Sequence, residues 1–377
     1  MTMKSIANPA KTFSIPSLDG IRALSFLIVF VAHDNFKPVP GLFGVAVFFF
    51  LSGYLITTLM RIEIENTGTI SIEGFYLRRA FRILPPFYIV LLLIILVVKA
   101  GVLPGYYDSA DLTASVLYVT NFWNIYAHPI QMPGFNIFWS LAVEEHFYLV
   151  FPFLMLLMIR LKLNRRSQVS ILLALCTAVL IWRCILVFRL HSLNMVFGLV
   201  TDPLRTMYGT DTRIDSILFG CVLALWGNPV LDNKPKHNWP LTLAGALTLL
   251  GTFVYRDLVF RETIRYTLQS LALMPLFIAA IRLHNHWAFR WLNSRPLRFI
   301  GVLSYSLYLV HFPILKIVQA WSDNRLVVGF VAMSISLVLA YTLHVLVEKP
   351  LARFRRRFGS RTAEVITQPA VEVAAVG

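Results

Sequence analysis

Arg22 and His33 are two ionisable residues within one short apolar segment near the start of the chain. Eleven positions separate them, about three α-helical turns, so we expect both side chains on one helix face. The rise between them is roughly 16 Å, about half of a hydrocarbon core. Ionisable groups at that depth are costly and are usually kept for function. A neutral buried imidazole accepts protons, which makes His33 a candidate general base, although a histidine that only links two helices fits equally well.

Arg22 has the chemistry to bind a phosphate or a carboxylate of a neighbouring helix. The structural alternative is an interfacial arginine paired with Asp19, three residues earlier. A second basic group, Arg78, Arg79 and Arg82, stands at the start of a predicted span. Such a cluster would hold a polyanionic cofactor, but it also agrees with the excess of basic residues on the cytosolic side of membrane proteins.

Glu144, Glu145 and His146 enter an apolar run together. Two adjacent carboxylates repel each other in a medium of low dielectric constant, so we expect one of them to hold a proton. The alternative places all three at the outer end of the helix, where the helix dipole favours acidic groups.

A second deep histidine, His311, lies in a later apolar run that carries several hydroxyl groups, including that of Tyr305. His311 could orient a substrate or form a partner of Glu144, and the hydroxyls could instead only link helices. Tyr305 and Trp139 are further candidates for substrate binding.

The pattern Asp211, Arg213 and Asp215 opens another predicted span at its outer end. These three residues are candidates for binding a sugar. An ion-pair network at the membrane interface is the alternative, and it is slightly favoured.

Composition indicates a membrane protein. Of 377 residues, 57% are hydrophobic and 14% are charged, with a mean hydropathy of +0.69. Soluble proteins have about 25% charged residues. The net charge is +15, but the Lys and Arg residues are concentrated in certain loops. This distribution is typical of residues that set the orientation of a membrane protein rather than of a nucleic-acid-binding surface. The three cysteines lie in apolar runs without the spacing of metal ligands, and we expect them to be small core residues.

The apolar runs predict an all-α, polytopic protein with about ten transmembrane helices, several short or broken. We expect a break at Ser52-Gly53, and Pro85-Pro86 to open the third span. The predicted spans are 19–36, 41–60, 83–101, 138–159, 169–189, 213–227, 240–255, 266–282, 299–320 and 326–347.

The basic connections place both termini in the cytosol, although the connection 256–265 carries three arginines on the predicted outer side. This division gives a cytosolic N-terminal tail (1–13), a membrane domain (14–350) and a basic, partly disordered cytosolic tail (351–377). We expect no removable signal peptide and no soluble catalytic domain after the last span. The longest outer loop, 102–137, is rich in Tyr, Trp, Asn and Pro, as functional loops often are. The basic residues on the predicted cytosolic side are Arg61, Arg78, Arg79, Arg82, Arg160, Lys162, Arg165, Arg166, Lys234, Lys236, Arg282, Arg290, Arg295, Arg298, Lys349, Arg353, Arg355, Arg356, Arg357 and Arg361.

Seven segments in a fixed order resemble the acyltransferase-3 family of integral membrane O-acyltransferases, and together they cover nearly the whole chain. Any one of them is a weak signal, whereas the set is specific. The segments are 18–23 with His33, 48–56, 75–83, 139–149, 211–215, 305–311 and 348–350.

The resemblance implies a multi-pass protein of the bacterial inner membrane that moves an acyl group, usually acetyl from acetyl-CoA, to a hydroxyl of a carbohydrate acceptor. The acceptor would be a cell-surface or secreted glycan or a lipid-linked glycan, such as lipopolysaccharide, exopolysaccharide or a lipo-oligosaccharide signal. It implies that Arg22 and His33 are the essential pair, and that Glu144 or Glu145 belongs to the reacting centre. Arg78, Arg79 and Arg82 would hold the phosphates of the donor. His146 stands where many relatives have glutamine.

Some relatives carry an appended extracytoplasmic hydrolase-like domain that completes the transfer. We expect this chain to lack such a domain and to act alone or with a separate extracytoplasmic partner. His33 would act as base or as acyl carrier, and the sequence does not separate these mechanisms. A transporter or flippase of a glycan or lipid-linked sugar, or a non-catalytic scaffold, would show similar buried charges.

Overall fold

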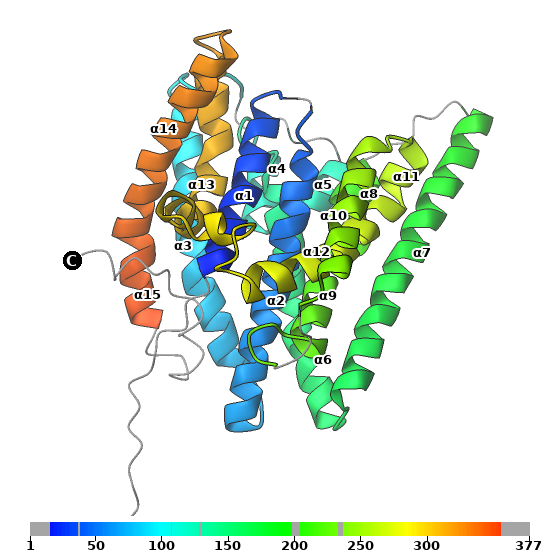
Figure 1. Cartoon of the computed structure of the whole chain (residues 1–377). Coiled ribbons are helices and arrows are strands. Elements are labelled where there is room, and N and C mark those ends of the chain that lie inside the picture. Colours follow the sequence, from blue (N-terminus) through cyan, green and yellow to red (C-terminus); the bar gives the residue numbers. More distant parts are fainter. Residues whose placement is uncertain are drawn as a thin grey trace, which may run out of the picture.

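The computed structural model describes residues 16–36, 38–106, 108–127, 130, 132–197, 204–232 and 237–355, and all further structural statements concern these residues. Within them the chain is helical and contains no strand, so the prediction of an all-α protein is confirmed (Figure 1). The elements are α1 (Pro16–His33), α2 (Gly41–Thr67), α3 (Ile72–Lys99), α4 (Ser109–Val116), α5 (Thr120–Tyr126), α6 (Phe138–Arg160), α7 (Arg165–Phe197), α8 (Leu204–Tyr208), α9 (Thr210–Trp226), α10 (Trp239–Val254), α11 (Leu258–Glu262), α12 (Ile264–Arg282), η1 (Arg290–Asn293), α13 (Arg295–Gln319), α14 (Arg325–Leu343), η2 (His344–Glu348) and α15 (Lys349–Arg355).

Seven helical runs in this part of the chain are long and apolar enough to cross a membrane. They are α2, α3, α6, α12, α13, the Arg165–Arg189 part of α7 and the Arg325–Phe354 run. The chain is therefore a multi-pass membrane protein. The other three predicted spans correspond to α1, α9 and α10, with 18, 17 and 16 residues, and they are not among the seven. The count of about ten stays a prediction.

The third span begins earlier than predicted, because Pro85 and Pro86 lie inside α3 rather than at its start. Ser71 caps the helix by accepting a hydrogen bond of 3.1 Å from the backbone N–H of Gly74. The two prolines remove two backbone donors but do not end the helix. The early start brings the basic turn of Arg78, Arg79 and Arg82 into α3 itself.

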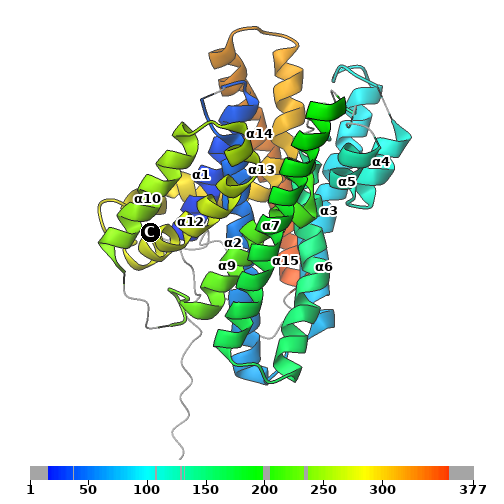
Figure 2. The ribbon, with the colours of Figure 1, turned by 90° about the vertical axis from the view of Figure 1, so that its right-hand side faces the viewer.

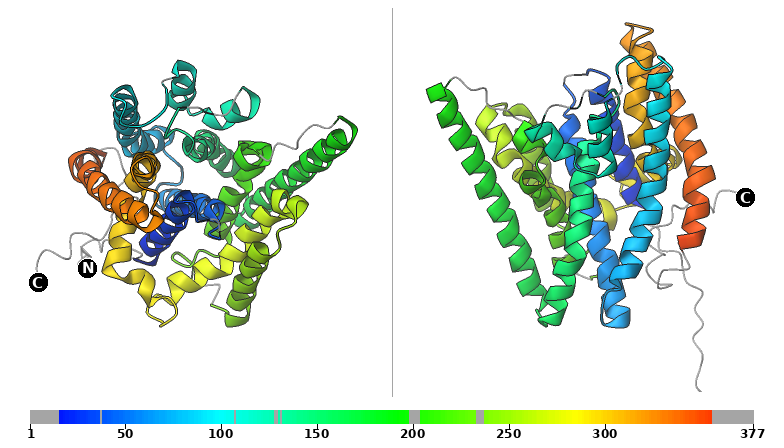
Figure 3. Two further views of the ribbon diagram at one scale, coloured as in Figure 1. Left: turned by 90° about the horizontal axis from the view of Figure 1, so that it is seen from above. Right: turned by 180° about the vertical axis from the view of Figure 1, so that it is seen from behind.

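The helix α2 lies at the centre of the bundle and packs against α1 and α9 (Figures 2 and 3). Gly53 of α2 and Gly220 of α9 permit this close approach. A Cβ atom on Gly53 would lie 1.9 Å from the carbonyl oxygen of Ile217, and one on Gly220 would lie 2.0 Å from that of Phe50. Small residues at a membrane helix interface let two backbones meet. The predicted break at Ser52-Gly53 was therefore wrong: α2 is continuous there.

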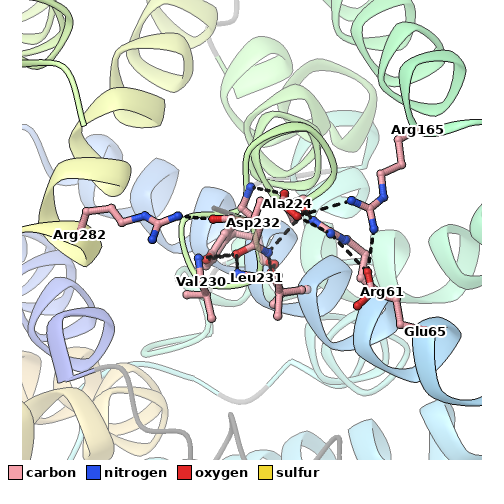
Figure 4. Close-up of polar contacts among 11 residues, drawn as sticks. Arg61, Glu65, Arg165, Ala224, Val230, Leu231, Asp232 and Arg282 are labelled. Atoms are coloured by element: carbon pink, nitrogen blue, oxygen red, sulfur yellow. Dashed lines mark hydrogen bonds and ion pairs between the residues drawn. The ribbon is translucent and has the colours of Figure 1, made fainter. Parts of the chain in front are cut away.

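At one end of the bundle, α2, α7, α12 and the segment after α9 are joined by an ion-pair network around Asp232 (Figure 4). The carboxylate of Asp232 accepts hydrogen bonds of 2.8 and 3.0 Å from Arg61, which is 4% exposed. Arg165 bonds Glu65 at 2.7 Å, and Arg282 donates to the carbonyl oxygen of Asp232. We call this the basic end; it includes the connections after α2 and α6 (Figure 1).

Five of the basic residues that were predicted on the cytosolic side lie outside the described part of the chain. They are Lys234, Lys236, Arg356, Arg357 and Arg361. The opposite end, which we call the far end, carries α4, α5, α8 and α11 (Figures 1 and 2). There the predicted long loop holds two short helices. Asp111 of α4 accepts hydrogen bonds of 3.0 Å from the indole of Trp123 and from the backbone of Met132.

Candidate active site

Five helices, α1, α2, α3, α6 and α13, enclose a pocket in the middle of the protein. We call it the central pocket; with its open mouth it contains about 930 Å³ of empty space. Segments that are far apart in the sequence meet here because their helices pack around α2. The lining residues are Arg22, Val45, Phe48, Phe49, Leu51, Ser52, Leu55, Ile56, Arg79, Arg82, Ile83, Ser140, Leu141, Glu144, Glu145, Tyr148, Ser304, Tyr305 and Tyr308.

Three arginines and two carboxylic acids line this pocket: Arg22, Arg79, Arg82, Glu144 and Glu145. All five were candidate site residues in the sequence, and they come from α1, α3 and α6. Arg22 also forms the expected ion pair with Asp19, at 2.8 Å. A cavity with guanidinium groups beside carboxyl groups can bind an anion and hold a dissociable proton in one place.

Arg78 does not line the central pocket, although the sequence grouped it with Arg79 and Arg82. Its guanidinium donates to Glu63 of α2 at 2.9 Å. Residues three apart share a helix face, so Arg79 and Arg82 reach the pocket while Arg78 turns toward α2. The structure therefore separates one structural arginine from two pocket arginines.

Glu144 is held by two hydroxyl groups inside the pocket. Ser52 of α2 donates to it at 3.0 Å, and Tyr148, one helical turn later on α6, donates at 3.1 Å. Arg79 lies over the ring of Tyr148, with 5.6 Å from its guanidinium carbon to the ring centroid. The Glu144 carboxyl group is thus fixed in orientation, as acid-base chemistry requires.

His33 and His311 are direct partners, which the sequence did not predict. The Nδ1 atom of His33 lies 2.9 Å from the Nε2 atom of His311, and the rings are nearly parallel, with 13° between their planes. His311 is completely buried, whereas His33 is half-buried at the end of α1. The ring of Phe312 contacts His33 edge-on at 4.9 Å between centroids.

The backbone around His311 decides which nitrogen atoms carry hydrogen. Its Nδ1 atom lies 3.1 Å from the carbonyl oxygen of Leu307 and 2.8 Å from that of Tyr308. Carbonyl oxygens only accept, so Nδ1 of His311 must donate, and Nε2 of the neutral ring must accept. His33 therefore donates through Nδ1 and keeps its lone pair on Nε2. That atom can accept a proton or attack a carbonyl carbon.

Tyr308 lies between the histidine pair and the central pocket. Its ring lines the pocket, its hydroxyl lies 2.6 Å from that of Ser140, and its carbonyl oxygen accepts from His311. Neither His33 nor His311 is among the pocket-lining residues. The idea that His311 pairs with Glu144 was wrong, because His311 pairs with His33 and Glu144 pairs with Ser52 and Tyr148.

The pattern around Arg213 lies outside the central pocket. Asp211 pairs with Arg205 at 2.9 Å and accepts from the indole of Trp182 at 2.7 Å. Asp215 pairs at 2.9 Å with Arg183, and both side chains are fully buried. These contacts favour the ion-pair reading for the two aspartates.

Three other candidates occupy different positions. Tyr305 lines the pocket and donates to the carbonyl oxygen of Ile83 at 2.8 Å. Trp139 packs against Tyr208, with 4.9 Å between ring centroids, and does not line the pocket. His146 lies 2.7 Å from the hydroxyl of Thr210, apart from the two glutamates.

Sequence reasoning did not single out five hydroxyl-bearing pocket residues: Ser52, Ser140, Tyr148, Ser304 and Tyr308. All but Ser304 stand in segments that carried the family resemblance, and Tyr148 follows Glu144 by one helical turn. That spacing was the available signal. No group of three acidic, histidine or cysteine side chains that could hold a metal occurs in the described ranges.

Comparison with known proteins gives a consistent result. A family model described as an acyltransferase domain matches residues 15–345. Similar proteins include the peptidoglycan O-acetyltransferase OatA of Listeria monocytogenes, 32% identical over 80% of this chain and 50% of that protein. They also include a putative peptidoglycan O-acetyltransferase, YrhL, of Bacillus subtilis, 31% identical over 89% of this chain and 55% of that protein. A putative O-acetyltransferase of Staphylococcus aureus is 29% identical over 90% of this chain and 57% of that protein.

This chain spans about half the length of the curated relatives that it matches. No solved structure matches it. The family match covers the helices that build the central pocket and the histidine pair. The chain therefore belongs to the acyltransferase-3 family of integral membrane acyltransferases.

Proposed function

We propose that this protein transfers an acetyl or other short acyl group from acetyl-CoA to a hydroxyl of a cell-wall glycan. Peptidoglycan is the glycan in the names of two relatives, and it is the acceptor class that we propose here. The observation that carries the proposal is the meeting of Arg22, Arg79 and Arg82 with Glu144 in one pocket, next to a histidine pair.

The pocket has the chemistry that an acyl-CoA donor requires. Its arginines offer charge-assisted hydrogen bonds to the donor phosphates, and α3 brings Arg79 and Arg82 from the basic end. The neighbouring apolar wall, which includes Phe48 and Leu55, suits an uncharged pantetheine arm.

His33 supplies the base in this proposal. Its Nε2 atom takes the proton of the acceptor hydroxyl while the hydroxyl oxygen attacks the thioester carbonyl carbon. The new C–O bond forms, the C–S bond breaks, and the leaving thiolate recovers the proton from His33. If the acyl group is first transferred to His33, the Nε2–C bond forms as the C–S bond breaks and coenzyme A leaves as the thiolate. The acceptor hydroxyl then forms the C–O bond as the N–C bond breaks, and its proton passes to the thiolate.

The topology that we propose places the basic end and both termini in the cytosol of a bacterium, with the protein in its cytoplasmic membrane. The donor would enter from the basic end and the acceptor from the far end. Residues 14–350 would form the acyltransferase domain, with one cytosolic tail before it and one after it in the sequence. A separate extracytoplasmic protein is the partner that we propose for completing transfer to the glycan.

Acyl transfer by the purified protein tests this proposal. The protein, in nanodiscs, is supplied with acetyl-CoA and muropeptides, and free thiol and acetylated product are measured together. Wild type should form both in equal amounts, His33→Gln neither, and the matched control His146→Gln should stay active. Transport of the sugar into sealed proteoliposomes without acyl transfer would instead support the transporter alternative.

A further inference from the structure

Arg213 of α9 is a completely buried arginine without a hydrogen-bond acceptor in the described part of the chain. All three nitrogen atoms of its guanidinium group lack a partner. Two aromatic rings lie beside it: the ring centroid of Tyr266 is 3.8 Å from the guanidinium carbon, and that of Phe49 is 5.9 Å away. Buried charges are normally paired, so this arrangement needs an explanation.

The groups around Arg213 include two further guanidinium groups and one carboxylate. Arg183 and Arg265 lie over the same Tyr266 ring, at 5.3 and 5.0 Å from its centroid. Asp215 attracts Arg213 electrostatically but forms no hydrogen bond with it, because its carboxylate is engaged by Arg183 and by the hydroxyl of Thr267. Three guanidinium groups thus gather around one ring.

Stacking on an aromatic ring recovers part of the cost of dehydrating a guanidinium group, but it does not satisfy its five N–H donors. A water molecule could satisfy one or two of them and would leave the charge unbalanced. An oxyanion would satisfy both demands, since a carboxylate or phosphate accepts two parallel hydrogen bonds from one arginine.

We propose that Arg213 binds an oxyanion group of the acyl acceptor, with Arg265 as a second contact. The ligand class is a saccharide that carries a carboxylate or a phosphate. The identification of this ligand as the acceptor rests on the proposed function, whereas the anion site itself does not.

The position of Arg213 fits an acceptor that enters from the far end. It stands in the first turns of α9, whereas the basic-end residue Asp232 follows the other end of that helix. Phe49 belongs both to the wall of the central pocket and to the surroundings of Arg213. A rotation of this side chain would therefore connect the anion site with the pocket.

The test compares Arg213→Met, which keeps the length and removes the charge, with Arg256→Met at an exposed far-end position. Full-length protein in nanodiscs is titrated with N-acetylmuramic acid, with inorganic phosphate and with neutral N-acetylglucosamine. Dissociation constants and the Tm without ligand are measured for each variant, and coenzyme A binding is measured as a reference.

We expect wild type and Arg256→Met to bind an oxyanion probe at least about tenfold more tightly than N-acetylglucosamine, and Arg213→Met to lose this preference. The unliganded Tm of Arg213→Met should equal or exceed that of wild type, because an unpaired buried charge is removed. Coenzyme A binding should not change. A preference for phosphate over N-acetylmuramic acid would assign a phosphorylated acceptor.

A wild type that binds all three probes equally would overturn the inference, and so would an Arg213→Met protein with a lower Tm and an intact oxyanion preference. Oxyanion binding without any acyl transfer would instead contradict the proposed function and leave the anion site standing.

Discussion

His311 should act as a positioning residue that keeps the proton of His33 on Nδ1. The contact between the two rings is a buried hydrogen bond of 2.9 Å, and the backbone of α13 fixes the orientation of His311. His311→Leu removes the acceptor, so the Nδ1–H tautomer of His33 loses its advantage. The proton can then sit on Nε2, where it blocks the base.

The size of this effect follows from the loss of one buried hydrogen bond. Leaving a buried donor unsatisfied costs about 1–3 kcal/mol. Since about 1.4 kcal/mol corresponds to a factor of ten, kcat should fall by about 5- to 150-fold in His311→Leu. The KM for acetyl-CoA should not change, because His311 does not line the central pocket.

The assay is acyl transfer by purified protein at saturating acceptor, with His311→Gln as the conservative variant. The amide oxygen of glutamine can accept from His33, so His311→Gln should retain more activity than His311→Leu. Phe312→Leu is the matched control, because it removes a ring contact with His33 but no hydrogen bond. A wild-type kcat in His311→Leu, or a loss confined to KM, would refute the reasoning.

Three further predictions concern the pocket and the basic end. Arg79→Gln and Arg82→Gln should each weaken coenzyme A binding about tenfold in calorimetry, whereas Arg78→Gln should lower the Tm and leave the dissociation constant unchanged, since Arg78 pairs with Glu63. Glu144→Gln should reduce kcat by about 10- to 100-fold with little loss of Tm, because the amide oxygen still accepts from one of the two hydroxyls and the amide N–H can donate to the other; full turnover would remove Glu144 from the reacting centre. Asp232→Asn should lower stability by about 1–3 kcal/mol, because the buried Arg61 loses its closer charge partner and keeps only Glu65, at 3.4 Å. Burial raises the pKa of Asp232, but the hydrogen bond and charge of Arg61 outweigh burial and lower this pKa overall. The stabilisation by the ion pair is therefore complete above the unfolded pKa of about 3.9 and is lost as the pH falls through the folded pKa. The Tm difference between wild type and Asp232→Asn should therefore be constant from about pH 5 to 8 and shrink below about pH 4; a difference that grows in acid would contradict the ion-pair account.

The sequence predicted the helical membrane class and the five charged residues of the pocket, because apolar runs and costly buried charges are local signals. It did not predict where helices end. Charges near a helix end look like a boundary, yet α2 continues to Thr67, and Arg61 inside it pairs with Asp232, 171 positions later. Such pairing depends on tertiary packing that no local pattern encodes.

Partners across the bundle were missed for the same reason. His33 and His311 are 278 positions apart, and only the packing of α1 on α13 brings them together. Arg78 and Arg79 look equivalent in sequence, but the helix turns one toward Glu63 and the other into the pocket. Neighbours on a helix separate by about 100°, so the orientation of α3 decides which arginine meets the ligand.

Acylation of the cell-wall glycan by wild type and by His33→Ala tests the central claim most directly. Both are expressed in a strain that lacks the gene, blotting confirms equal amounts in the membrane, and mass spectrometry reports the acyl groups on the isolated glycan. We predict acyl groups with wild type and none with His33→Ala. Equal acylation in both strains would contradict the account, because it would remove the Nε2 atom of His33 from the reaction.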